Sequence, residues 1–134
     1  MPQIRPSLSP GLRSCALFAL LAVAMAPAAY AERTLGSLRF EPCTLTSDGS
    51  AQTVEAQCTT LRVPENRAAP DGRQIDLAIA WVPSTSAQAK PDPVFMLAGG
   101  PGQAARAGYV GVASAFAQIR RNRHIILVDQ RGTG

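Results

Sequence analysis

The chain has 134 residues, with 13 basic and 9 acidic side chains and a formal net charge of +4. This small excess of positive charge argues against a dedicated acidic partner such as nucleic acid. Cys43, Cys58 and the single histidine, His124, do not make a zinc site, because the third cysteine, Cys15, lies in the apolar run near the start of the chain. We therefore expect no metal, no cofactor and no nucleic-acid partner.

Residues 1–31 have the pattern of an export signal. Arg5 and Arg13 supply the basic start, residues 15–25 form the apolar core, and Ala29-Tyr30-Ala31 fits the small-x-small cleavage rule. A membrane anchor, the alternative, would need roughly 20 apolar residues, which is longer than this run. We predict cleavage after residue 31, a periplasmic or secreted protein, and no stable membrane association afterwards.

Two cysteines, Cys43 and Cys58, remain after the predicted cleavage. An even pair in an oxidising compartment is more often bonded than free. A bond between them would close a loop of about 16 residues and contribute about 3 kcal/mol by the chain-entropy relation. We predict this disulfide, with two unpaired thiols as the alternative.

The segment after the leader divides into an arm and a hairpin. Residues 32–57 are polar and rich in turn formers, so we predict an irregular amino-terminal arm tied down by the disulfide. Residues 58–63 and 74–82 alternate in the manner of half-buried strands, and a long Pro-Asp-Gly loop joins them as a hairpin. One face of the second strand carries Ile75, Leu77, Ile79 and Trp81. We assign residues 58–134 to one partial α/β domain.

Two continuous apolar runs, residues 93–98 and 124–128, indicate strands buried on both faces, as in parallel sheets. The segment between them carries the apolar stripe of one amphipathic helix, formed by Tyr109, Val112, Phe116 and Ile119. Asn122 is the candidate for a left-handed residue that ends this helix. The sequence therefore predicts an α/β fold, in which an antiparallel hairpin leads into a parallel β-α-β unit.

Each apolar run is followed by a glycine-rich turn, Gly99-Gly100-Pro101-Gly102-Gln103 after the first and Asp129-Gln130-Arg131-Gly132 after the second. The carboxyl ends of neighbouring parallel strands meet at one edge of a sheet, where α/β folds place their chemistry. Pro101 has no N–H, whereas the residues around it can donate. Free backbone donors near a helix N-terminus suit a developing negative charge. A tight turn selected for sterics alone is the alternative.

Nucleotide binding is a second chemical interpretation of these turns. Gly100-x-Gly102-x-x-Ala105 matches a dinucleotide fingerprint, and Asp129 ends the next strand. However, Pro101 removes a donor from the loop, and dinucleotide folds usually begin with this strand rather than with a hairpin. Export also leads away from the cytosolic cofactor pool. We therefore favour a site that holds no nucleotide.

Both turns, with the strands before them, resemble the amino-terminal part of α/β-hydrolases of the proline iminopeptidase and tripeptidyl aminopeptidase group. The resemblance lies in the run from Val94 to Gln103 (VFMLAGGPGQ) and in the run from Ile126 to Gly134 (ILVDQRGTG). The hairpin over residues 58–80 is similar to the opening of the secreted branch of this group. Together these similarities cover about Cys43 to Gly134.

The resemblance implies an exported serine hydrolase, above all an aminopeptidase that removes amino-terminal residues from peptides. It implies that Gly100 supplies an oxyanion-hole N–H. The residues that would shape the site are Gly99, Pro101, Gly102, Gln103, Asp129, Gln130, Arg131 and Gly132. Among these, Asp129 and Arg131 would form an ordering pair. Ala98 stands where the group has histidine, so the strict iminopeptidase pattern is not met.

No nucleophile, acid or base of such an enzyme is expected within this chain. It contains no Gly-x-Ser-x-Gly, Ser114 falls inside the predicted helix, and His124 opens a predicted strand, where a structural role is expected. We predict an incomplete α/β-hydrolase fold, an amino-terminal fragment that is inactive alone. The substrate of the whole enzyme would be a peptide or a small ester. An esterase or lipase-like hydrolase on the same fold and a secreted non-catalytic protein are the alternatives.

Overall fold

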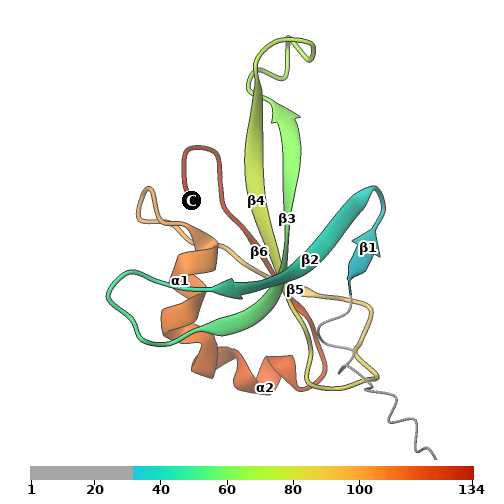
Figure 1. The fold of residues 1–134 in the computed structure, drawn as a ribbon, viewed down its shortest axis with the longest axis vertical. Coiled ribbons are helices and arrows are strands. Elements are labelled where there is room, and N and C mark those ends of the chain that lie inside the picture. The colour runs from blue at the N-terminus through green and yellow to red at the C-terminus, as the bar shows by residue number, and fades with distance from the viewer. Residues whose placement is uncertain (1–31) are drawn as a thin grey trace, which may run out of the picture.

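The computed structural model describes residues 32–134, which form a six-stranded mixed sheet with one helical segment packed on it (Figure 1). The strands are β1 (Arg33–Leu35), β2 (Leu38–Leu45), β3 (Val54–Pro64), β4 (Gln74–Val82), β5 (Val94–Met96) and β6 (Ile125–Val128). The helical segment comprises α1 (Ala105–Val112), a 3-10 turn (Ala113–Phe116) and α2 (Ala117–Arg120). The strand order is β1-β2-β3-β4-β6-β5. The predicted leader, residues 1–31, lies outside the described residues.

The predicted hairpin is present as β3 and β4, which pair antiparallel from Gln57 opposite Trp81 to Pro64 opposite Gln74. Ile79 and Trp81 pack on one face of the sheet, as the alternation predicts. The other face of β4 is buried as well, because Ala80 and Val82 belong to the core beneath the helix. The small side chain of Ala80 leaves room there for α1 to approach the sheet.

A crossover places β6 between β4 and β5, with β5 and β6 parallel as predicted. The expectation of two fully buried strands holds for β6, whose first three residues are buried. It is wrong for the other apolar run, in which Phe95 is 60% exposed and Leu97 is 78% exposed. β5 forms the edge of the sheet, so its residues lack the neighbours that bury a central strand.

Residues 32–57 do not form the predicted irregular arm, since they contain β1, β2 and the start of β3. β2 pairs with β1 through residues 38–40 and with β3 through residues 41–45. Its side chains alternate between two cores, because Phe40 packs on one face of the sheet while Cys43 and Leu45 pack on the other. The spread of these few apolar residues over both faces hides the strand period in the sequence.

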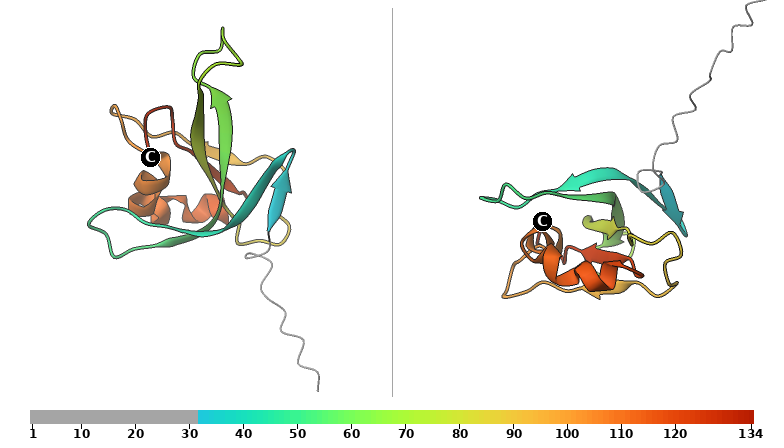
Figure 2. Two further views of the ribbon diagram at one scale, coloured as in Figure 1. Left: turned by 45° about the horizontal axis from the view of Figure 1, so that its top comes forward. Right: turned by 90° about the horizontal axis from the view of Figure 1, so that it is seen from below.

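The sheet curls around α1, as the view from below shows (Figure 2). α1 contacts both β6 and β2, although β4 and β3 lie between those two strands in the sheet. Its buried face consists of Ala105, Tyr109 and Val110. Tyr109 is 0% exposed and its ring contacts that of Phe116 at 5.3 Å between centroids. The arm, through β2, therefore forms part of the wall around the helix.

The predicted single helix is interrupted. α1 ends at Val112, whose backbone leaves the helical region at φ −118° and ψ 8°, and a 3-10 turn precedes α2. Gly108 and Gly111 weaken this stretch, because glycine has low helix propensity. The prediction of Asn122 as a left-handed cap is also wrong, because within residues 32–134 only glycines have a positive φ. The Asn122 N–H instead donates to the Ile119 carbonyl at 3.2 Å.

Cys43 and Cys58 form the predicted disulfide, with 5.8 Å between their Cα atoms. Cys43 lies opposite Ala56 and Cys58 opposite Glu41, so the bond joins β2 and β3 diagonally. Both sulfurs lie at the core beneath α1. The bond thus fastens the curled end of the sheet to the hairpin.

Thiol labelling of the chain recovered from an oxidising compartment is expected to find neither Cys43 nor Cys58 free unless a reductant is added. Replacing both cysteines by serine should lower the free energy of unfolding by about 3 kcal/mol, because the unfolded chain regains the entropy of an open loop. Two labelled cysteines in the folded, unreduced chain would contradict the bond.

The face of the sheet opposite α1 carries an apolar groove of about 240 Å³. Its lining residues are Leu35, Leu38, Phe40, Ile79, Trp81, Pro91, Pro93, Phe95, His124, Ile126 and Val128. His124 packs edge-on against Trp81 at 4.9 Å between centroids, and its Nδ1 accepts the Ser84 N–H at 3.0 Å. Burial, helped by the positive charge of Arg33, lowers the pKa of His124. This histidine therefore has the structural role that its position predicts.

Stability is expected to fall as the pH decreases below about 6.5, the ordinary pKa of a histidine. The unfolded chain takes up a proton there, whereas burial shifts the protonation of His124 in the folded protein to lower pH, so the full contribution is present only above that pH. Denaturant unfolding at several pH values between 7.5 and 5 measures how the free energy of unfolding changes with pH. His124→Asn keeps an acceptor for Ser84 without a titrating ring, and equal slopes for the two proteins would exclude His124 as the cause.

Candidate functional site

Two loops meet at the carboxyl edge of the parallel strands. The glycine-rich loop (residues 97–104) follows β5, and the Asp129 loop (residues 129–134) follows β6. Gln130 Nε2 in the second loop donates to the carbonyl of Ala98 in the first at 3.1 Å. The structure therefore brings together the two motifs that the sequence singles out, as adjacent parallel strands require.

Two glycines determine the path of the glycine-rich loop. Gly100 has φ +137° and Gly102 has φ +88°, a region that residues with a side chain rarely adopt. Pro101, between them, has no N–H to donate. Within residues 32–134, no backbone hydrogen bond is donated by Gly100 or Gly102. The loop thus presents unpaired N–H groups just before α1, whose N-terminus carries a partial positive charge.

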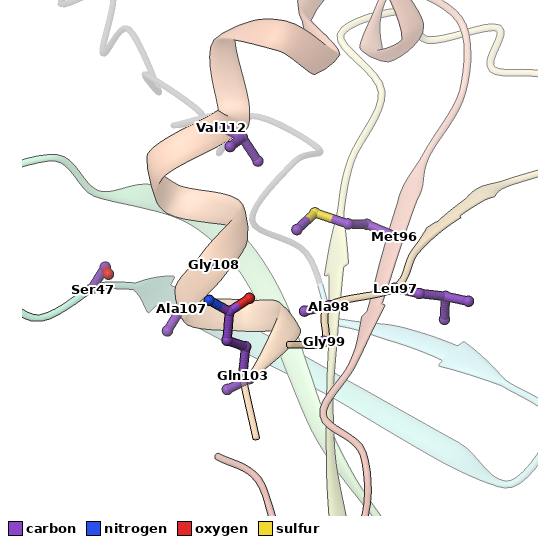
Figure 3. A pocket seen from close by; sticks show the side chains of 10 residues that line it. Ser47, Met96, Leu97, Ala98, Gly99, Gln103, Ala107, Gly108 and Val112 are labelled. Atoms are coloured by element: carbon purple, nitrogen blue, oxygen red, sulfur yellow. The ribbon is translucent and has the colours of Figure 1, made fainter. Parts of the chain in front are cut away.

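A cleft of about 560 Å³ lies beside this loop, between the end of β5 and α1 (Figure 3). Gln103 and Ser47 supply its polar side chains, and Ser47 comes from the β2–β3 connection. The remaining lining residues are Met96, Leu97, Ala98, Gly99, Ala104, Ala107, Gly108 and Val112. Small residues along α1 leave this space open, so a ligand group could reach the glycine-rich loop.

Asp129 is buried and does not pair with Arg131, contrary to the expected ordering pair. Its carboxylate Oδ1 accepts the backbone N–H of Arg106 at 3.0 Å, and its Oδ2 lies 3.2 Å from Arg106 Nε. Arg131 points elsewhere, and its Nη1 donates to the Glu65 carbonyl in the β3–β4 connection at 2.6 Å. Residues two apart on a turn diverge here because one faces the helix and the other the hairpin.

Arg106 is the site residue that sequence reasoning missed. It stands outside the apolar stripe of the helix, so periodicity gives it no role. The available signal was Ala104, which precedes the helix and has no side chain able to cap it. A helix that begins without a capping side chain and has an arginine in its first turn is stabilised by a carboxylate from elsewhere in the chain, which can accept from the backbone and pair with the arginine.

The Asp129 loop closes on itself through its second and fifth residues. Thr133 donates to the Gln130 carbonyl from its N–H at 3.0 Å and from its hydroxyl at 2.9 Å. Gly132 lies between them with φ +77°, which permits this tight turn. The loop therefore holds the Gln130 amide where it reaches Ala98.

The geometry gives no support to nucleotide binding. Asp129 is 1% exposed, its Oδ1 accepts the Arg106 N–H and its Oδ2 faces the Arg106 guanidinium, so a ribose hydroxyl does not reach this carboxylate. Among residues 32–134, no group of three or more histidine, cysteine or acidic side chains is placed to hold a metal ion. The same residues contain no helix long and apolar enough to cross a membrane.

Comparison with protein-family models and with curated proteins finds no match to this chain. The class of site is therefore defined by its own geometry. Within residues 32–134, it is a set of unpaired backbone donors at the carboxyl edge of a parallel strand pair, just before a helix N-terminus. The same loop lines an open cleft through Gly99 and Gln103, although neither Gly100 nor Gly102 is among the lining residues. Such a set can stabilise an anion, either bound or formed during a reaction.

Proposed function

We propose that this chain is the amino-terminal part of an exported serine hydrolase, in the first place an aminopeptidase acting on peptides. The observation that carries the proposal is the pair of N–H groups at Gly100 and Gly102, which have no hydrogen-bond partner within residues 32–134 and lie just before the first turn of α1. The resemblance of the two motifs to the proline iminopeptidase and tripeptidyl aminopeptidase group assigns the oxyanion contact to Gly100. A carbonyl oxygen that becomes negative would bind this N–H most strongly in the transition state.

The remaining catalytic groups belong to sequence outside this chain. A serine there attacks the carbonyl carbon of an amide or ester, its proton passes to a base, and the carbonyl oxygen takes the negative charge. Collapse of this intermediate expels the amine or alcohol, which receives the proton. In this scheme the chain supplies the donor, the loop that aims it and one wall of the cleft.

Two features support a larger domain around these residues, and a third supports export. β5 is an edge strand whose outer side has no partner strand among the described residues, and Phe95 within it and Leu97 after it are exposed. The apolar groove opposite α1 is built from strands and loops without a covering helix among the described residues. The Cys43–Cys58 disulfide fits an oxidising compartment, in agreement with a periplasmic or secreted protein.

Residues 32–134 alone are expected to hydrolyse neither aminoacyl nor short acyl esters above a blank, because an oxyanion donor without a nucleophile and base does not complete the reaction. The expected positive result comes from the longer protein that carries this sequence. An acyl ester cleaved in preference to aminoacyl substrates would favour the esterase alternative. Turnover by residues 32–134 that is lost on treatment with a serine-directed phosphonate would refute the proposed division of the catalytic groups.

A further inference from the structure

The carboxylate of Asp129 contacts one residue of α1 in two ways. Oδ1 accepts the Arg106 backbone N–H at 3.0 Å, while Oδ2 lies 3.2 Å from the Nε of the same arginine. The side chain of Asp129 is 1% exposed and that of Arg106 is 34% exposed. In the first turn of the helix, Asp129 therefore makes a hydrogen bond to the main chain of Arg106 and an ion pair, without hydrogen-bond geometry, to its side chain.

This contact replaces a cap that the helix lacks. Ala104 precedes α1 with extended backbone angles and makes no side-chain hydrogen bond to it. A carboxylate at a helix N-terminus is favourable because it binds an otherwise unpaired N–H and opposes the helix dipole. Here the acid comes from the end of β6, which lies between β4 and β5 in the sheet.

Asp129 is itself held firmly. Its backbone N–H donates to the Ala78 carbonyl of β4 at 2.9 Å, which extends the pairing of β4 with β6 by one residue. The chain of contacts thus runs from β4 through Asp129 to Arg106, four residues after Gly102. Gln130, the next residue, reaches the Ala98 carbonyl at the other end of the glycine-rich loop.

We propose that Arg106 and Asp129 are positioning residues that orient the N–H groups of Gly100 and Gly102. The two ends of the glycine-rich loop are fastened to the Asp129 loop, one through the Arg106–Asp129 pair and the other through Gln130. Within residues 32–134, neither glycine donates a backbone hydrogen bond that would fix the direction of its N–H. The functional part of this inference rests on the proposed oxyanion role of Gly100, whereas the structural part does not.

Amide hydrogen exchange on the chain tests the structural part. Arg106→Gln removes the guanidinium and leaves its backbone N–H, and Asp129→Asn keeps an oxygen acceptor without the charge. Both variants should change the amide signals of Gly100 and Gly102, and Asp129→Asn should speed exchange of the Arg106 amide about tenfold. Arg123→Gln is the matched control. It breaks another arginine–aspartate pair, in which Arg123 Nη2 lies 2.9 Å from Asp92 Oδ2, and this pair is outside the glycine-rich loop and the Asp129 loop.

The inference is overturned if both site variants fold and the amide signals of Gly100 and Gly102 are as little changed in them as in the Arg123→Gln control. Should one variant fail to fold, the other decides. In the protein that carries the whole site, Arg106→Gln should lower kcat roughly 10- to 100-fold with little change in KM, because the donor is misaimed rather than removed. Arg106→Lys, which restores the charge, should recover part of this loss.

The two measurements separate the two proposals. If a variant changes the amide signals of Gly100 and Gly102 but leaves kcat unchanged, the positioning role of the pair is retained and the oxyanion role of Gly100 is rejected. Unmoved amides with reduced kcat would reject the positioning pair, while the proposed function would stand.

Discussion

If the proposed function holds, Gly100→Pro in the protein that carries this chain is expected to lower kcat by about 10²–10³-fold, the usual loss for one oxyanion donor. Proline removes the N–H of residue 100, so the developing negative charge loses its partner in the transition state. KM should change less than kcat, because the neutral carbonyl of the bound substrate depends less on that contact. Steady-state kinetics on the folded variant measures both constants.

Two control variants separate the missing donor from backbone strain. Gly100→Ala keeps the N–H but places a side chain at φ +137°, so it reports the cost of strain alone. Gly99→Ala adds a methyl group that meets no atom within 4 Å and needs no positive φ, so it should retain most activity. If Gly100→Pro and Gly100→Ala lose the same activity, strain accounts for the loss and Gly100 is not a donor.

Tyr109→Ala is expected to lower the free energy of unfolding by about 3–5 kcal/mol, the typical cost of truncating a buried aromatic residue. Tyr109 is 0% exposed and lies in the core between α1 and the sheet. Truncating it would leave a cavity that the helix and the strands around it cannot close by small shifts. Chemical denaturation at neutral pH gives the value. A loss under about 1 kcal/mol would mean that the helix does not pack on the sheet in this way.

The matched variant Tyr109→Phe should keep the stability of the parent or exceed it by about 1 kcal/mol. Within the described residues, the Tyr109 hydroxyl is buried and has no hydrogen-bond partner, so its removal relieves a desolvation cost. Burial also raises the pKa of this hydroxyl, which keeps it neutral. Marked destabilisation by phenylalanine would reveal a partner for the hydroxyl outside residues 32–134.

The sequence was informative wherever a local pattern determines the structure. Alternation predicted β4 and the face that bears Ile79 and Trp81, and the continuous apolar run predicted β6. The parallel pairing of β5 with β6 followed from the same runs and the helix between them. This parallel pairing also predicted that the two glycine-rich turns would meet, because adjacent parallel strands end at the same edge of a sheet.

The rest depends on contacts between distant residues. β2 was missed because Phe40 and Leu45 face different cores, so no single face shows a period. The exposure of Phe95 could not be read from its apolar neighbours, since it depends on β5 lying at an edge. Asp129 was expected to pair with Arg131, but the unsatisfied N-terminus of α1 attracts the carboxylate more effectively than a nearby side chain in the same turn.

Labelling the native protein that carries this sequence with a fluorophosphonate, followed by peptide mapping, tests the central claim most directly. The account predicts that the folded protein from the exported fraction is labelled at one serine outside residues 32–134, in a Gly-x-Ser-x-Gly context. It also predicts that Gly100→Pro slows this labelling, because the reagent's phosphoryl oxygen occupies the oxyanion site. Absence of labelling in the folded protein, or labelling at a serine within residues 32–134, would contradict it.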